Sequence, residues 1–365
     1  MRVQDRVKFQ QVQKRVKFVR AGFILISCVI LVSCEPTVVK PPPDDDSKYN
    51  IWVLNEGVWG MNNGSITAYN TSTYEKESDI YSVANKEKLG DLPNDILLYG
   101  AKIYVVVSTS NLINVIDSKT GVSIKQIPSS PASQPRQIAS HNGKVYVCCF
   151  DGSVVKIDTT SLVIEETKKA GRNPDGICVA NNKLYVSNSG GLDYETGNYD
   201  NTVSVFDLNT FTEIKKIEVR INPTLIKADK NGNIYLISKG NYMDISSCLQ
   251  RISTTDHVEI MVEDVTGFDI YNDYLYFYTY DFMSSSTSYR VFDLLQNSIV
   301  NANFISGDNL PQTPNGISVN PKNGDVYIFD ALDYTSMGDV YCFDRNGKKK
   351  FQFEAGIIPK KAIFK

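Results

Sequence analysis

From about residue 50 onward, the chain repeats one pattern of apolar and polar positions. A short apolar run carrying one aromatic residue follows a tight turn, and a polar loop then leads to another apolar run that closes on a turn residue. The clearest copy spans residues 173–210, with apolar runs at 177–179, 184–187 and 202–206. Such short runs between Asn/Gly turns and polar loops predict antiparallel β-strands.

The aromatic residue of this pattern occurs seven times. Its successive positions lie 39 to 52 residues apart. These positions are Trp52, Tyr104, Tyr146, Tyr185, Tyr235, Tyr276 and Tyr327. The spacing is typical of four-stranded propeller blades. A strand introduced by proline precedes most of the turns, and proline suits a strand entry because it donates no ladder hydrogen bond.

The two ends of the repetitive region predict how the ring closes. The first copy begins directly with its second strand, 51–54, and residues 358–364 resemble the proline-led first strands of the other copies. We therefore predict an all-β fold over residues 50–365. It is a seven-bladed β-propeller of four-stranded antiparallel blades, closed by the C-terminal strand joining the N-terminal blade, which leaves no exposed sheet edge.

The first fifty residues have a different character. Residues 1–20 are basic and 21–32 are apolar apart from Ser27, which is too short to span a bilayer but typical of a secretory signal. Leu31 and Ser33 precede Cys34 as in a bacterial lipoprotein cleavage box. We predict a signal peptide over 1–33, lipidation of Cys34, a Pro/Asp-rich tether over 34–49, and a lipid anchor as the membrane link. The alternative is an uncleaved anchor followed by a chance cysteine.

Charge and cysteine usage narrow the function classes. The formal net charge is −3, and loss of residues 1–33 would make it −9. An acidic chain without a basic stripe does not suit nucleic-acid binding. The later cysteines are odd in number and have no CxxC spacing, so we expect small buried thiols rather than disulfides or a zinc site. They are Cys148, Cys149, Cys178, Cys248 and Cys342.

Binding residues are expected on one rim of the propeller, where second-to-third loops and inter-blade crossings meet. Its loops (55–64, 188–201, 238–247, 279–288 and 330–338) are unequal and rich in Asn, Gly, Tyr, Asp and Met. Exposed aromatics on a rigid scaffold indicate recognition, here of a neutral ligand. The alternative is that several of them fold inward over the strand ends. The candidate ligand-binding residues are Trp59, Asn63, Asp95, Arg136, Asp175, Tyr194, Tyr199, Tyr242, Tyr280, Phe282, Asp330 and Tyr334.

The sequence contains few features typical of a catalytic site, and we predict neither an enzyme nor a cofactor. His141 and His257 are expected near turns of the opposite rim, and no Walker, GxSxG or HExxH pattern is present. Asp193, Glu195 and Asp200 carry hard oxygen ligands for calcium, but their spacing matches no established calcium loop, so solvated carboxylates are favoured and no metal is predicted. Carboxylates at the channel mouth leave a propeller hydrolase or lactonase open as an alternative.

Several motifs resemble a known family. They are NEGVWGMNNGSITAYN, LYVSNSGG followed by YDNTVSVFDLNTF, IKADKNGNIYL and VYCFDRNGK. From Asn50 to the C-terminus the chain resembles the YncE-like β-propeller lipoproteins of Bacteroidota, a group that includes the cobalamin-binding surface protein BtuG. The resemblance implies a lipid-anchored propeller on the outer membrane surface that captures a small-molecule nutrient, with cobalamin or another corrinoid as candidate, and passes it to a TonB-dependent transporter. A surface adhesion or scaffold protein is the other alternative.

Overall fold

The computed structural model describes residues 48–307 and 310–365, all within the unit Asp45–Lys365. The predicted signal peptide (1–33), Cys34 and all but the last two residues of the predicted tether (34–49) lie outside the described residues. In the described part of the chain, no helix has both the length and the apolar character needed to cross a membrane.

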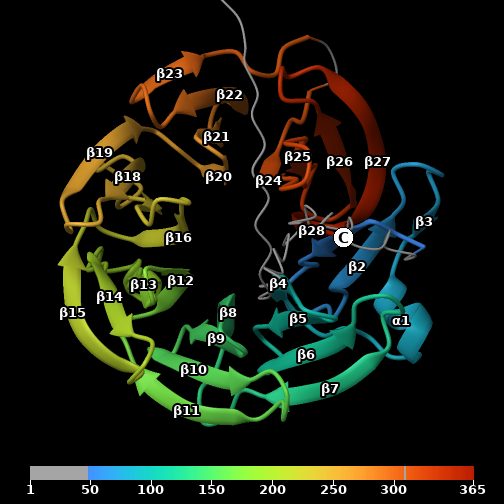
Figure 1. Ribbon diagram of the computed structural model, residues 1–365. Coiled ribbons are helices and arrows are strands. Elements are labelled where there is room, and N and C mark those ends of the chain that lie inside the picture. Colours follow the sequence, from blue (N-terminus) through green and yellow to red (C-terminus); the bar gives the residue numbers. More distant parts are fainter. Residues whose placement is uncertain (1–47, 308–309) are drawn as a thin grey trace, which may run out of the picture. The chain divides into compact units, whose positions relative to one another are not determined.

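Seven four-stranded antiparallel sheets surround a central opening (Figure 1). From the innermost strand outward, blade 1 contains β28 (Pro359–Phe364), β1 (Ile51–Asn55), β2 (Ser65–Tyr69) and β3 (Lys76–Glu77). Blade 2 contains β4 (Pro93–Tyr99), β5 (Lys102–Val107), β6 (Leu112–Asp117) and β7 (Ser123–Pro128), and blade 3 contains β8 (Pro135–His141), β9 (Lys144–Cys149), β10 (Ser153–Asp158) and β11 (Ile164–Lys169). Blade 4 contains β12 (Pro174–Ala180), β13 (Lys183–Asn188), β14 (Thr202–Asp207) and β15 (Thr212–Glu218).

The remaining blades follow the same order. Blade 5 contains β16 (Pro223–Ala228), β17 (Ile234–Ser238), β18 (Cys248–Ile252) and β19 (Val258–Glu263). Blade 6 contains β20 (Gly267–Tyr271), β21 (Tyr274–Asp281), β22 (Ser286–Asp293) and β23 (Ser298–Asn301), and blade 7 contains β24 (Pro314–Val319), β25 (Val326–Asp330), β26 (Met337–Phe343) and β27 (Lys349–Ile357). Two short helices, α1 (Ile80–Asn85) and η1 (Gly191–Asp193), follow β3 and β13.

The two ends of the propeller meet in blade 1. Strand β28 pairs antiparallel with β1, with Ile51 opposite Phe364 and Val53 opposite Ala362. The predicted closure is confirmed, and β1 is paired on both of its edges.

The hydrophobic core lies between neighbouring blades, because each sheet buries both faces. On β1, Trp52 and Leu54 pack in a cluster with blade 2, whereas Ile51 and Val53 pack in another cluster with blade 7. Alternate residues of a strand point to opposite faces. Both sets must therefore be apolar, which explains the continuous apolar runs. All seven aromatic positions of the repeat are buried.

Turn chemistry and cysteine burial match the expectations from sequence. Asp117 starts its turn by accepting the N–H groups of Lys119 and Thr120 through Oδ1, and the equivalent aspartates do the same. The five cysteines of the described residues are free and buried. Burial raises the pKa of Cys248 to about 11, so its thiol is protonated at neutral pH.

Candidate functional site

Six of the seven inner strands have a register irregularity at the end where they enter the channel. In blades 2, 3, 4, 5 and 7 the pairing shifts directly after the entry proline, and in blade 1 it shifts around Lys360. A bulge leaves a residue outside the ladder and re-aims its side chain. Thr266 precedes β20 at the matching position of blade 6. We call these residues the bulge ring: Asn94, Arg136, Asp175, Thr224, Thr266, Asn315 and Lys360.

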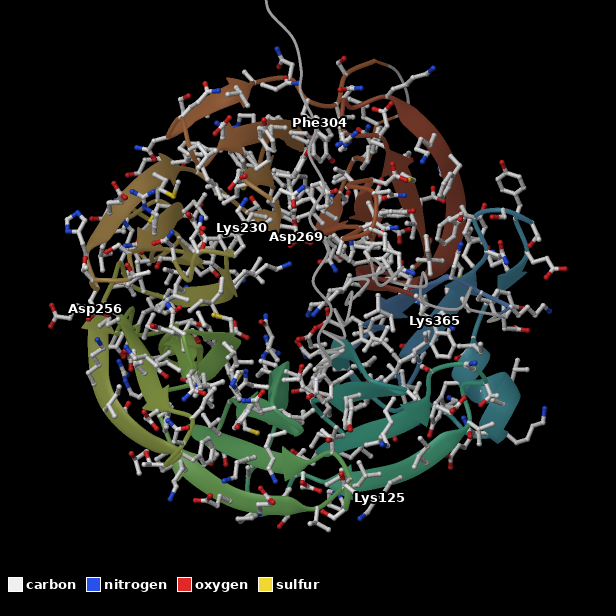
Figure 2. The ribbon with its side chains drawn as sticks, viewed as in Figure 1. Lys125, Lys230, Asp256, Asp269, Phe304 and Lys365 are labelled. Carbon is white, nitrogen blue, oxygen red and sulfur yellow. The ribbon has the colours of Figure 1, made fainter. Side chains whose placement is uncertain are left out.

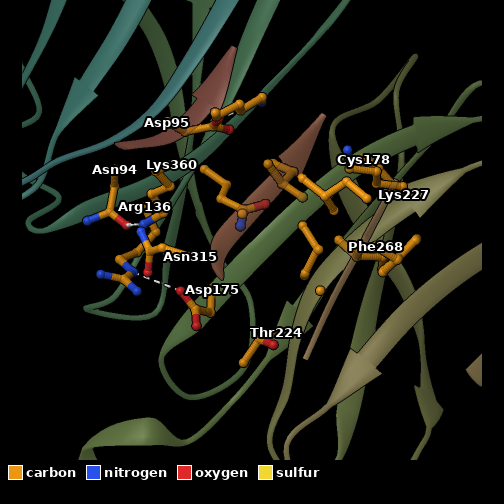
Figure 3. Close-up of a pocket in the computed structure, with 18 of the residues that line it drawn as sticks. Asn94, Asp95, Arg136, Asp175, Cys178, Thr224, Lys227, Phe268, Asn315 and Lys360 are labelled. Atoms are coloured by element: carbon orange, nitrogen blue, oxygen red, sulfur yellow. Dashed lines mark hydrogen bonds and ion pairs between the residues drawn. The ribbon is translucent and has the colours of Figure 1, made fainter. Parts of the chain in front are cut away.

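The bulge ring surrounds a central cavity of about 740 Å³ (Figure 3). All seven ring residues line it. Glu56, Lys239, Tyr280 and Tyr334, which come from the second-to-third loops or their edges, line it as well. The cavity mouth therefore opens among the rim loops, and its volume lies in the range that small-molecule sites occupy.

Arg136 and Asp175, at neighbouring positions of the bulge ring in blades 3 and 4, form an ion pair. The Arg136 Nε donates to Asp175 Oδ1 at 2.8 Å, and the guanidinium carbon lies 5.0 Å from the centre of the Phe150 ring. Burial acts to raise the pKa of Asp175, but the positive charges of Arg136 and Lys239 outweigh it and hold that pKa below its usual value. Asp175 is therefore ionised at neutral pH.

A second set of charges joins blades 1 and 2. Lys360 Nζ donates to Glu56 Oε2 at 3.2 Å and to Asn94 Oδ1 at 3.0 Å. Lys361 Nζ lies 2.5 Å from Asp95 Oδ1, and the other oxygen of this buried carboxylate accepts the N–H of Ile138 from blade 3. The carboxylate of Asp95 thus holds three neighbouring inner strands together.

Farther along the channel, the carboxylate of Asp269 joins the inner strands of blades 5, 6 and 7 in the same way. Its Oδ1 accepts from Lys227 Nζ at 2.5 Å and its Oδ2 accepts the N–H of Val319 at 2.8 Å. Figure 2 shows Asp269 beside the central opening, whereas Lys125 and Asp256 lie at the outer edge.

The rim aromatics divide into an exposed and a cavity-lining group. Trp59, Tyr194, Tyr242 and Phe282 are exposed by 75, 62, 69 and 72%. Tyr280 and Tyr334 are half-buried and line the cavity. The loops of Trp59, Tyr242 and Phe282 also supply the cavity residues Glu56, Lys239 and Tyr280, so these three exposed side chains border the mouth.

Three of the candidate ligand-binding residues are held by contacts within the rim and do not line the cavity. The Asp330 side chain is fully buried, because Oδ2 accepts the N–H of Gln312 and Oδ1 accepts those of Thr313 and Leu332. Tyr199 is buried, with its ring centre 6.3 Å from that of Tyr242. Asn63 Oδ1 accepts the N–H of Val58 within the β1–β2 loop. We leave these three outside the candidate site.

The acidic loop considered for calcium is engaged by arginine. Arg172 forms ion pairs with Asp193 and with Asp200. Within residues 48–307 and 310–365, no three His, Cys, Asp or Glu side chains are grouped to hold a metal ion. His141 ends β8, and His257 lies between β18 and β19, so both occupy the rim opposite the loops.

The cavity residues that were not predicted include Glu56, Asn94, Lys239 and Lys360. For Asn94 and Lys360 a signal existed, since each follows the entry proline of an inner strand, as Arg136 and Asp175 do. Glu56 and Lys239 each directly follow a second strand, and their sequence neighbours do not show that this position reaches the cavity.

Solved structures share the fold at low sequence identity. The chain is similar to a quinonprotein alcohol dehydrogenase-like protein of Bacteroides thetaiotaomicron (TM-score 0.63, 15% identity, covering 87% of this chain and 78% of that one). It is also similar to the hydrazine synthase of Kuenenia stuttgartiensis (TM-score 0.58, 16% identity, 69% and 76%) and to U3-55K (TM-score 0.53, 9% identity, 73% and 86%). These likenesses concern the fold alone.

A comparison with curated proteins found no match. One family model covers nearly all of the described residues, from 49 to 365. Its description is a domain of unknown function, DUF5074. The chain, a seven-bladed propeller, belongs to the DUF5074 family.

Proposed function

We propose that this propeller is a lipid-anchored outer-membrane protein that captures a small-molecule nutrient at the channel mouth and passes it to a TonB-dependent transporter. The observation that carries the proposal is the cavity of about 740 Å³ at the bulge ring, bordered by loops with exposed aromatic side chains. A corrinoid such as cobalamin is the candidate ligand, as the resemblance to YncE-like lipoproteins implies.

The exposed rim side chains support a binding role. Met61, Met243 and Met283 are exposed by 63, 86 and 92% on the same loops as the exposed aromatics. Large exposed apolar groups gathered on one surface mark contact with a ligand or partner. The loops stand on fully paired strands, so they lose little conformational freedom on binding.

The state of the channel carboxylates favours capture over hydrolysis. Asp95 pairs with Lys361 and Asp175 with Arg136, and the lowered pKa of Asp175 keeps it ionised. A general acid needs a proton near neutral pH and therefore a raised pKa. These carboxylates accordingly suit a structural and electrostatic role.

Isothermal titration of the protein with cyanocobalamin and cobinamide tests the ligand. We expect heat of binding at micromolar concentrations, and its absence for both compounds would eliminate the corrinoid version. Affinity capture from outer-membrane extract tests the partner, where we expect a TonB-dependent receptor. A Cys34→Ala variant tests the anchor, since the protein should then leave the membrane fraction.

A scaffold that binds other proteins is the second candidate. The exposure of Trp59 together with Met61 favours it, because aromatic residues and methionine are enriched at protein interfaces. Capture of a surface protein other than a transporter, without any small-molecule binding, would support this candidate instead.

A further inference from the structure

The walls of the cavity carry more positive than negative charge, although the whole chain is acidic. Three acidic side chains line it: Glu56, Asp95 and Asp175. Five basic side chains line it: Arg136, Lys227, Lys239, Lys360 and Lys361. Four of the five basic groups have a carboxylate partner, counting Asp269, which pairs with Lys227. The surplus charge at the mouth is that of Lys239.

Lys239 is an exposed side chain that borders the ring. It directly follows β17, and among the described residues its ammonium has no ion-pair or hydrogen-bond partner. Its charge acts on Asp175 together with that of Arg136, which places the three groups in one electrostatic neighbourhood. An unpaired cation over a cavity attracts anions.

Arg136 is held in place while some of its guanidinium N–H groups remain unpaired. Its Nε bonds Asp175 and its face lies on Phe150. In the described ranges, its two terminal nitrogens have no hydrogen-bond partner. A guanidinium fixed in this way presents its remaining N–H groups in the fork that matches carboxylate and phosphate oxygens.

Asn94 provides a further donor at the equivalent ring position of blade 2. Its side chain is only 4% exposed, and its Nδ2 is buried without a partner among the described residues. Its Oδ1 is already engaged by Lys360. A buried donor left unsatisfied costs free energy, and an acceptor on a ligand in the cavity would remove that cost.

We propose that the channel mouth binds an oxyanion, a carboxylate or phosphate group of the captured ligand, between Lys239, Arg136 and the Asn94–Lys360 pair. Figure 3 shows Arg136, Asn94 and Lys360 on the cavity wall. This inference rests on the proposed capture function and specifies the chemistry of its ligand. It replaces the expectation of a wholly neutral ligand, because the loops supply the apolar contacts while the ring supplies charge-assisted donors.

Titration of the full chain with inorganic phosphate and with citrate at low ionic strength tests the inference. The variants are Lys239→Gln and, as a matched control, Lys322→Gln, an exposed lysine in the β24–β25 turn of the opposite rim. We expect binding of one or both anions. Lys239→Gln should raise the dissociation constant about tenfold, as expected for a hydrogen bond to a charged group. Lys322→Gln should leave it unchanged, and added NaCl should weaken binding.

The outcomes separate this inference from the function on which it rests. Binding of citrate alone identifies a carboxylate site and binding of phosphate alone a phosphate site, and both support the oxyanion. If neither anion binds, or if both lysine variants weaken binding equally, the inference is overturned. Heat with cobinamide in that same case would leave nutrient capture standing without an anion site.

Discussion

At the scale of single residues, the aspartates have distinct structural tasks. One group starts turns on the rim opposite the loops, as Asp117 does. A second group, Asp95 and Asp269, joins neighbouring inner strands through one lysine and one backbone N–H from another blade. Asp330 forms a third case, because its buried carboxylate fixes two segments of the rim.

Replacing Asp330 with alanine should destabilise the protein strongly. The change would leave three backbone N–H groups without the buried carboxylate that accepts them, and we expect a loss of about 3 kcal/mol in the free energy of unfolding. Urea denaturation measures it. Asp333→Ala, at an exposed site in the same loop, serves as the control and should have a smaller effect. Equal effects of the two variants would contradict this role for Asp330.

The Arg136–Asp175 pair should give stability a characteristic pH dependence. The pKa of Asp175 is lowered in the folded state from an ordinary value near ~4. Its contribution is therefore fully present above about pH 4 and is lost as pH falls through the folded pKa. At pH 7 we expect Asp175→Asn to cost about 2 kcal/mol. Urea denaturation at several pH values should show this difference shrinking below about pH 4, and a constant difference would refute the assignment.

For single residues, the sequence indicates the surroundings of a side chain better at positions that repeat from blade to blade than in the rim loops. Arg136 and Asp175 follow entry prolines, and both line the cavity. Tyr199 lies in a long loop and Asp330 ends β25 where such a loop begins, and whether such a side chain turns inward depends on neighbours that are distant in sequence. Asp330 illustrates this, since it is buried by its bonds to residues 312 and 313.

At the scale of elements, each inner strand pairs with the second strand of its blade and lies close to the inner strand of the next blade. Each contributes one bulge-ring residue and then packs beside the next inner strand. At Gly176 that approach is close, because an added Cβ would lie 2.1 Å from the carbonyl oxygen of Thr224 in blade 5. The same oxygen accepts a hydrogen bond from Ser187 Oγ.

Gly176→Ala should therefore push β12 and β16 apart. Overpacking of this kind costs about 2 kcal/mol and should lower Tm in a thermal melt followed by circular dichroism. Gly197→Ala is the comparison, since its Cβ would meet no atom within 4 Å and its cost comes from the left-handed backbone alone, about 1 kcal/mol. A Tm for Gly176→Ala at or above that of Gly197→Ala would show that β12 and β16 accommodate the added methyl group, which would contradict the prediction.

Strand β28 is the element on which ring closure depends. A chain ending at Ile357 would leave the inner edge of β1 unpaired and would expose Val53, whose strand partner is Ala362. We expect this truncation to lose cooperative thermal unfolding and to aggregate through the open edge. A truncated protein with the same Tm as the full chain would contradict the closure.

The fold was predictable because its signal is repeated. Seven buried aromatic residues at regular spacing, each in a second strand, fixed the blade count, and the missing first strand at Trp52 indicated the closure. The bulges were harder to foresee, since a proline indicates a strand entry but does not show that the next residue leaves the ladder.

At the scale of the whole molecule, the two rims differ in what they expose. The loop rim carries Trp59, Phe282 and all the exposed methionines of the described residues. The opposite rim carries short turns, the two histidines and isolated tyrosines such as Tyr74. The loop rim also surrounds the cavity mouth, so exposed apolar surface and a charged cavity occur together on one side of the propeller.

A paired tyrosine substitution tests most directly whether this rim is the binding surface. Tyr242 on the loop rim and Tyr74 on the opposite rim are exposed by 69 and 67%, and both have left-handed backbones with φ of 59° and 60°. Isothermal titration of cyanocobalamin into wild type, Tyr242→Ala and Tyr74→Ala compares them under equal strain. We expect binding by wild type, a roughly tenfold loss of affinity for Tyr242→Ala, and no change for Tyr74→Ala. Failure of the wild type to bind, or equal losses in the two variants, would contradict it.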